Sequence, residues 1–110
     1  MSKARIVNLV VTECDPAREA EFNKWYNEVH VPMLLKFKGI KKVTRYKMIE
    51  EKSQKPQYLA VYEYDTQKDL DSLPQSPEFK AAIAEMQGTW QGKGFEIMTT
   101  ASYEPLKTWE

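Results

Sequence analysis

The stretch "FNKWYNEVHVPMLLKFKGIKKVTRY", residues 22–46, contains the change of periodicity that decides the fold. From Phe22 onward, apolar side chains recur three and four residues apart, which is typical of one face of a helix. Pro32 has no backbone N–H and disfavours helical geometry in the residue before it, so we expect the regular helix to end near His30. After Gly39 the residues alternate as in a strand. The stretch therefore predicts a helix followed by a strand.

The flanking segments extend this pattern in both directions. Upstream, β-branched residues predict a strand, and Asp15 followed by Pro16 is a typical helix start. Downstream, a third strand is followed by a helix that Thr66 caps and Pro74 interrupts, and that restarts after Ser76. The predicted strands are "RIVNLVVTE" (5–13), "IKKVTRYKMIE" (40–50), "YLAVYEYD" (58–65) and "GFEIMTTASYEPL" (94–106), and Gly88 is expected to end the last helix.

The predicted order of elements is β-α-β-β-α-β, which defines an α+β, ferredoxin-like fold. We expect one domain over residues 1–110, with an antiparallel four-stranded sheet and helices on one face of it. The first strand has an unusual face, because Asn8 and Thr12 lie among apolar residues there. The uncovered face of the sheet also carries apolar side chains, and a face of that kind favours a partner. A homodimer that stacks sheet on sheet is the simplest solution.

The composition excludes several classes of function. The 110 residues contain 16 Lys plus Arg and 16 Asp plus Glu, so the formal net charge is zero and gives no general attraction to nucleic acid. The basic residues between Lys36 and Lys47 are flanked by acids, and we interpret them, Arg45 included, as a solvated rim. One cysteine, Cys14, and one histidine make a disulfide or a metal site within one chain improbable. No signal peptide or membrane span is expected, and the predicted compartment is the cytoplasm.

Residues 22–46 resemble the dimeric α/β-barrel superfamily, most closely its EthD-like branch. The features that carry the resemblance are an aromatic pair, a His-x-Pro at the helix end, a Leu-rich turn, a glycine and a strand ending in Arg-Tyr. The segments 58–65 and 76–86 continue the match in order. The resemblance implies a homodimer whose two sheets form a barrel, with a small-molecule cleft between sheet and helices in each subunit. Haem-degrading relatives place their histidine on the second helix, so neither haem nor another cofactor is expected here.

The candidate site centres on the only histidine of the chain. His30 lies at the edge of the apolar stripe, one turn beyond Tyr26, and an imidazole there suits a general acid or base. The alternative is a helix-end histidine that the helix dipole favours. We predict His30 and Tyr26 as catalytic residues. The predicted ligand-binding residues are Asn8, Trp25, Tyr46, Tyr62 and Trp90, the last as a loop residue that covers the cleft or anchors the loop.

Two classes of function remain open. The first is a cofactor-free enzyme of the cyclase, isomerase or monooxygenase type, acting on a small aromatic or polyketide-like molecule. The second is a non-catalytic homodimer that binds a small apolar or aromatic ligand, or an accessory protein of a catabolic pathway. In the first class the substitution of His30 abolishes turnover. In the second class ligand binding survives it.

Overall fold

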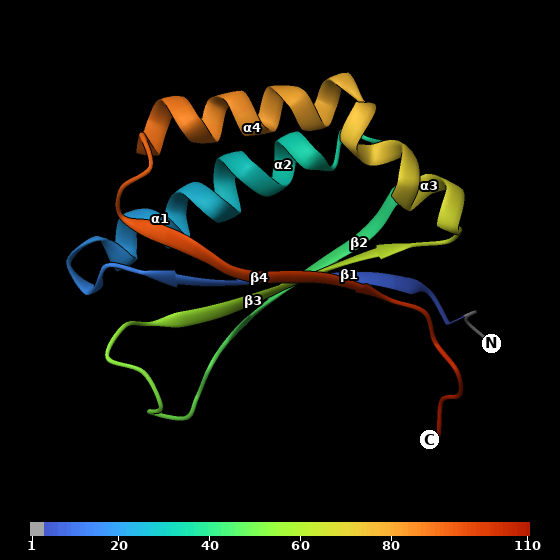
Figure 1. The fold of residues 1–110 in the computed structure, drawn as a ribbon, viewed down its shortest axis with the longest axis horizontal. Helices are drawn as coiled ribbons and strands as arrows, with labels where there is room; N and C mark the ends of the chain where they lie inside the picture. The colour runs from blue at the N-terminus through green and yellow to red at the C-terminus, as the bar shows by residue number, and fades with distance from the viewer. Residues whose placement is uncertain (1–3) are drawn as a thin grey trace.

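The computed structural model describes residues 4–110, and its element order confirms the predicted ferredoxin-like fold. The four strands form one antiparallel sheet in the order β2-β3-β1-β4. In this described part of the chain, the helices all lie on one side of the sheet and the opposite side carries none (Figure 1). The strands are β1 (Ile6–Cys14), β2 (Ile40–Lys47), β3 (Gln57–Tyr64) and β4 (Phe95–Tyr103); the helical segments are η1 (Pro16–Arg18), α1 (Glu19–Trp25), η2 (Tyr26–His30), α2 (Val31–Leu34), α3 (Gln67–Ser72), η3 (Leu73–Gln75) and α4 (Pro77–Trp90).

The first helical region continues beyond the predicted end at His30. Residues Tyr26–His30 form a π-helical turn, in which the N–H of Val31 bonds to the C=O of Tyr26. The chain then continues as α2, with Pro32 within its first turn. In a π turn the backbone hydrogen bonds span five residues instead of four, so the carbonyls are paired with different N–H groups. Pro32, which has no N–H to donate, is therefore tolerated directly after the turn. The prediction that the helix stops near His30 is therefore wrong, because it assumed an uninterrupted α-helical ladder.

The helix boundaries that depend on side-chain caps agree with the sequence. The Asp15 carboxylate accepts a hydrogen bond from the N–H of Ala17, and the hydroxyls of Thr66 and Ser76 cap α3 and α4. The last helix, however, does not stop at Gly88. It runs to Trp90 and ends where Gln91 adopts a left-handed conformation with φ of 53°. Trp90 is therefore the last residue of α4 and not a loop residue, which corrects the prediction.

The core lies between the sheet and the helices. Alternate residues of β3 face the helices and are buried, namely Tyr58, Ala60, Tyr62 and Tyr64. Phe22 of α1 is fully buried. It packs among the rings of Trp25, Tyr26, Tyr58, Trp90 and Phe95. This aromatic cluster fills one end of the layer between sheet and helices and leaves the other end to the cavity described below.

Strand β4 contains a β-bulge that changes which of its residues face the helices. Val11 pairs with Thr99, but the next residue, Thr12, pairs with Ile97, so Met98 is the extra residue. A bulge of this kind reverses the alternation of side chains on either side of it. As a result Ile97 faces the helical side before the bulge, and Thr100 and Ser102 face the same side after it.

Candidate functional site

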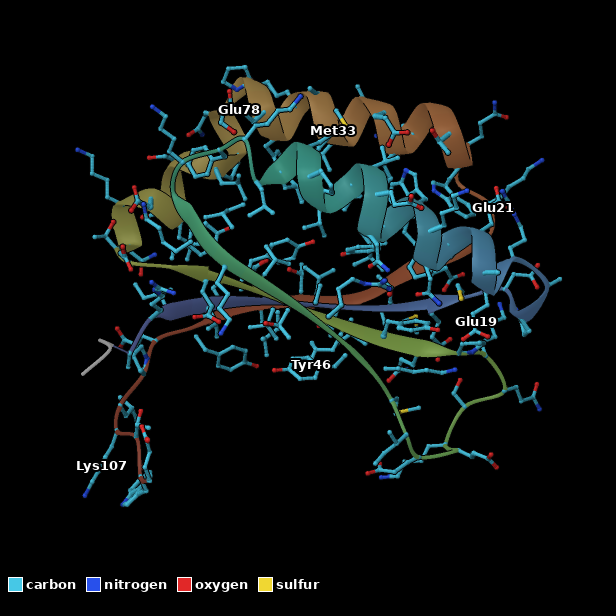
Figure 2. The ribbon with its side chains drawn as sticks, turned by 180° about the vertical axis from the view of Figure 1, so that it is seen from behind. Glu19, Glu21, Met33, Tyr46, Glu78 and Lys107 are labelled. Carbon is cyan, nitrogen blue, oxygen red and sulfur yellow. The ribbon has the colours of Figure 1, made fainter. Side chains whose placement is uncertain are left out.

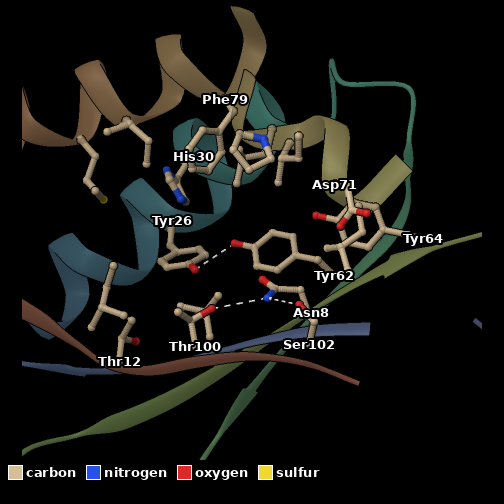
Figure 3. A pocket seen from close by; sticks show the side chains of 18 of the residues that line it. Asn8, Thr12, Tyr26, His30, Tyr62, Tyr64, Asp71, Phe79, Thr100 and Ser102 are labelled. Carbon is tan, nitrogen blue, oxygen red and sulfur yellow. Dashed lines mark hydrogen bonds between the residues drawn. The ribbon is translucent and has the colours of Figure 1, made fainter. Parts of the chain in front are cut away.

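A cavity of about 550 Å³ lies between the sheet and the helices. Its floor comes from β1, β3 and β4 and its roof from α1, η2, α2, α3, η3 and α4 (Figure 3). Most of the lining is apolar, contributed by side chains such as Leu34, Phe79, Ile83 and Met86. The exposed residues of the lining belong to the α3–η3 segment and to β4, so the cavity opens to solvent between them. Its size and lining are typical of a small-molecule site.

His30 lies in the roof of this cavity and is 7% exposed. Its ring stacks on Trp25, with 4.7 Å between the ring centroids, and meets the Tyr26 ring edge-on. Burial lowers the pKa of His30 from 6.5 to about 4; Glu85 opposes this shift and Arg45 adds to it. The imidazole is consequently neutral at pH 7, with one nitrogen as donor and the other as acceptor. Its Nδ1 is buried and has no hydrogen-bond partner among the described residues.

Two tyrosine hydroxyls form the polar centre of the cavity. The hydroxyl oxygens of Tyr26 and Tyr62 lie 2.9 Å apart and are hydrogen-bonded. Burial raises the pKa of both groups, so both are protonated at neutral pH. One hydroxyl donates to the other, which leaves the second proton of the pair for a ligand oxygen. A third hydroxyl of the lining, that of Tyr64, is buried and has no hydrogen-bond partner within residues 4–110, and burial raises its pKa to about 12.

Asn8 also lines the cavity, and its side-chain amide already has hydrogen-bond partners on the neighbouring strand β4. Its amide nitrogen donates to the Ser102 hydroxyl at 3.0 Å and lies 3.4 Å from the Thr100 hydroxyl. The Asn8 amide on this mainly apolar face of β1 is thus explained by the polar residues that the β4 bulge turns toward it (Figure 3). Its predicted role in ligand binding stays a prediction.

The remaining predicted residues are distributed unevenly. Trp25 lines the cavity with its ring, while its indole nitrogen donates to Glu85 at 2.9 Å. Trp90 is buried beside it in the aromatic cluster and does not line the cavity. Tyr46 is 53% exposed and points away from the helices, on the opposite side of the sheet (Figure 2). The cavity therefore brings together Asn8, Trp25, Tyr26, His30 and Tyr62 and excludes Tyr46 and Trp90.

The predicted set of site residues left out two residues that shape the site. Tyr64 was identifiable, because it shares a strand face with Tyr62 two residues earlier. Arg45 was placed in a solvated rim, but it is half-buried beneath the first helix. The sequence does contain a signal for this burial. Side chains alternate along β2, and the alternation places Arg45 on the same face as Val43. Among residues 4–110, no three or more His, Cys, Asp or Glu side chains gather in a way that could hold a metal ion.

Comparison with solved structures confirms the expected fold: the chain is similar to structures of EthD and antibiotic biosynthesis monooxygenase-like proteins. An EthD (ethyl tert-butyl ether D) family protein from Bacillus halodurans superposes with a TM-score of 0.67 at 20% identity, covering 92% of this chain and 99% of that one. A Bordetella bronchiseptica protein, assigned provisionally as an antibiotic biosynthesis monooxygenase, gives 0.70 at 19% identity, with 96% and 100% coverage. HapK from Hahella chejuensis gives 0.68 at 12% identity, with 96% of both chains covered. Identities this low establish the fold alone.

The family itself is established by sequence. Residues 5–102 match the model of a domain of unknown function, DUF4286, and the chain belongs to that family. No curated protein matches the chain. No helix in the described range is both long and apolar enough to cross a membrane. Family membership assigns no activity, so the function has to be argued from the cavity.

Proposed function

We propose that this chain binds a small, mainly apolar molecule with oxygen substituents, such as a phenol, a quinone or an enolisable ketone. The observation that carries the proposal is the distribution of polar atoms in the cavity. An apolar wall surrounds a neutral imidazole whose Nδ1 has no partner among the described residues, and the hydrogen-bonded Tyr26–Tyr62 pair lies beside it. Buried polar groups of this kind select ligands that satisfy them.

The same arrangement supports a cofactor-free reaction. The neutral imidazole of His30 accepts a proton from a C–H or O–H group of the ligand, and the electron pair of that bond stays on the ligand as an enolate or phenolate. The Tyr26–Tyr62 pair donates a hydrogen bond to the oxygen on which the charge develops. His30 then returns the proton, at the same or a different atom, which is the chemistry of an isomerase or a cyclase.

One observation favours the alternative, a non-catalytic binding protein. Burial lowers the pKa of His30 to about 4, and a base this weak removes protons from carbon slowly. In that case His30 only accepts a hydrogen bond from the ligand. Binding and catalysis are therefore separate parts of the proposal and need separate tests.

Binding is tested with the NMR signals of the single imidazole. 1-Naphthol and menadione are titrated into the wild-type protein while the His30 ring signals are followed. Saturable shifts of these signals in the wild type support binding in the cavity if they weaken in the Tyr62→Phe variant. The matched control is Tyr46→Phe, which alters a tyrosine outside the cavity and should leave the shifts unchanged. If neither compound shifts the signals, the proposed ligand class is wrong.

Catalysis is tested with 2-tetralone, a bicyclic ketone with acidic C–H groups. If His30 acts as a base, the wild-type protein accelerates exchange of these hydrogens in D₂O, and His30→Phe loses the acceleration while still binding the ketone. If wild type and variant exchange equally, the chain is a binding protein. The Tyr46→Phe variant again serves as the control, because it alters a tyrosine remote from the cavity.

We also propose that two copies of the chain associate through the uncovered face of the sheet. The half-buried side chains of Val7, Leu9, Leu59 and Val61 lie on this face, together with the exposed ring of Tyr103. The dimeric α/β-barrel resemblance supports the same arrangement. The test is analytical sedimentation. The proposal is supported if the wild type sediments as a dimer and Val61→Lys sediments as a folded monomer. A monomeric wild type contradicts it.

A further inference from the structure

Arg45 carries a positive charge that the ion pairs of the protein leave uncompensated. Its guanidinium is half-buried beneath the first helix, where Nη1 donates to Asn27 at 2.8 Å and Nη2 donates to Asn23 at 3.0 Å. Both acceptors are neutral amides. Among residues 4–110 no carboxylate forms an ion pair with Arg45, and the nearby carboxylate of Glu19 pairs with Lys47 at 3.1 Å. A half-buried cation without a counter-charge requires another source of stabilisation.

Part of that stabilisation comes from aromatic rings that separate Arg45 from the cavity. The guanidinium carbon lies 4.3 Å from the centroid of the Tyr26 ring and 5.0 Å from that of Tyr58. Cation–π contacts of this kind stabilise a partly desolvated guanidinium. Tyr26 also lines the cavity, where its hydroxyl meets that of Tyr62. The Tyr26 ring is thus in contact with the cation and with the cavity.

We propose that Arg45 is a positioning residue that stabilises the anionic form of a phenol or enol bound in the cavity, acting across the Tyr26 ring. The inference rests on the proposed function and narrows its ligand class to weakly acidic compounds that bind with a negative charge. An anion beside the Tyr26–Tyr62 hydroxyls accepts their free proton and lies on the far side of one ring from the guanidinium. The field of a cation acts over such a distance because little water lies between.

The charges around Arg45 determine how far its field reaches. Four of the titratable groups that face it are neutral at pH 7, namely Tyr26, Tyr58 and Tyr62 from η2 and β3 and the buried thiol of Cys14 from β1. The Glu19–Lys47 ion pair lines the same surface pocket as Arg45 and adds one charge of each sign. Arg45 lowers the pKa of His30 and opposes the burial-driven rise in the pKa of Tyr62, so its charge is felt inside the cavity. Glu85 has the opposite effect on His30, and Asp71 lies exposed at the cavity mouth.

The test uses 4-nitrophenol, whose hydroxyl ionises near neutral pH and whose phenolate absorbs visible light. Its pKa is measured by absorbance, free and bound to the wild-type protein. An apolar cavity alone raises the pKa of a bound phenol, whereas a nearby cation lowers it. We expect the wild-type protein to lower the pKa or leave it unchanged, and Arg45→Met to raise the pKa of the bound probe by about one unit relative to wild type.

Two variants separate the charge from a structural effect. Arg45→Lys keeps the charge and should retain most of the wild-type shift. Arg18→Met is the matched control. Arg18 lies 4.3 Å from the Trp90 ring centroid, the same spacing as between Arg45 and Tyr26, but the Trp90 ring does not line the cavity, whereas the Tyr26 ring does. Equal bound-probe pKa values in wild type and Arg45→Met overturn the inference. If Arg45→Met does not fold, a raised pKa on the wild-type protein overturns it.

Failure of this inference is distinguishable from failure of the proposed function. If 1-naphthol binds at His30 but 4-nitrophenol binds only as the neutral phenol, the cavity is a ligand site and Arg45 has no part in it. If 4-nitrophenol does not bind, the inference is wrong, whatever the result with 1-naphthol. If neither 1-naphthol nor menadione binds, the proposed ligand class fails as well.

Discussion

The buried imidazole of His30 makes the stability of this protein depend on pH in a way that one substitution should remove. The pKa of His30 is about 4 in the folded chain and about 6.5 when the chain is unfolded. The unfolded state therefore binds a proton more readily. Keeping His30 neutral therefore contributes to the free energy of unfolding. This contribution is fully present above pH 6.5, the pKa of the unfolded state. It is lost as the pH falls from 6.5 towards 4 and changes no further below pH 4.

The magnitude follows from the size of the shift. A difference of about 2.5 units between the two states corresponds to about 3 kcal/mol in total. About 2 kcal/mol of this is lost by pH 5. A loss of this size is a large part of the stability of a small domain.

The variant His30→Phe isolates this effect. Phenylalanine retains the stacking on Trp25. It removes the titration and also the buried Nδ1, which has no hydrogen-bond partner in the described part of the chain. Urea unfolding of both proteins is measured at pH 7, 6, 5 and 4.5. Carboxylates such as Glu19 and Glu21, whose pKa values are lowered by their partners, titrate in both proteins and cancel in the difference. The wild type should lose about 2 kcal/mol more than the variant between pH 7 and pH 5.

A difference between the two proteins that stays constant from pH 7 to pH 4.5 would refute this reasoning. NMR titration of the His30 ring in the wild type gives the folded-state pKa independently. A value near 6.5 would show that the imidazole is hydrated in solution, and that the cavity contains enough water to solvate its charge.

Four further substitutions test the packing, two glycine positions and a helix cap. Phe22→Ala removes a fully buried ring and should cost about 3–5 kcal/mol in urea unfolding, and a cost below about 1 kcal/mol would contradict the aromatic core. Gly94→Ala should lower the thermal midpoint, because φ is 93° and a Cβ would lie 2.8 Å from the Trp90 ring, whereas Gly88→Ala on the open surface of α4 should raise it. Ser76→Ala should cost about 1 kcal/mol by loss of the α4 cap, and an unchanged midpoint would show that the cap is dispensable.

Features set by neighbours in sequence were predictable. The alternation of Tyr58, Tyr62 and Tyr64 identifies the buried face of β3, since a strand turns every second side chain to the same side. The caps at Thr66 and Ser76 were predictable for a similar reason, because a side chain there bonds a backbone N–H three residues later. These interactions depend little on the rest of the fold.

Features set by distant parts of the chain were not predictable. The bulge at Met98 depends on how β4 pairs with β1, and it decides that Thr100 and Ser102 face Asn8. Arg45 looked like a surface residue because its charge was weighed with the neighbouring lysines. Its environment comes instead from Asn27 and Tyr26 on the helix above it.

The π turn shows most directly how tertiary structure determines the candidate site. In a regular α-helix, residues five apart point about 140° away from each other. A helical projection therefore separates Trp25 from His30, although the two rings are stacked in the structure. The wider turn at Tyr26–His30 brings them into line, and the same turn accommodates Pro32 just beyond it. Because this turn sets the burial of His30 and so lowers its pKa, the chemistry proposed for the cavity depends on a backbone irregularity that apolar periodicity cannot reveal.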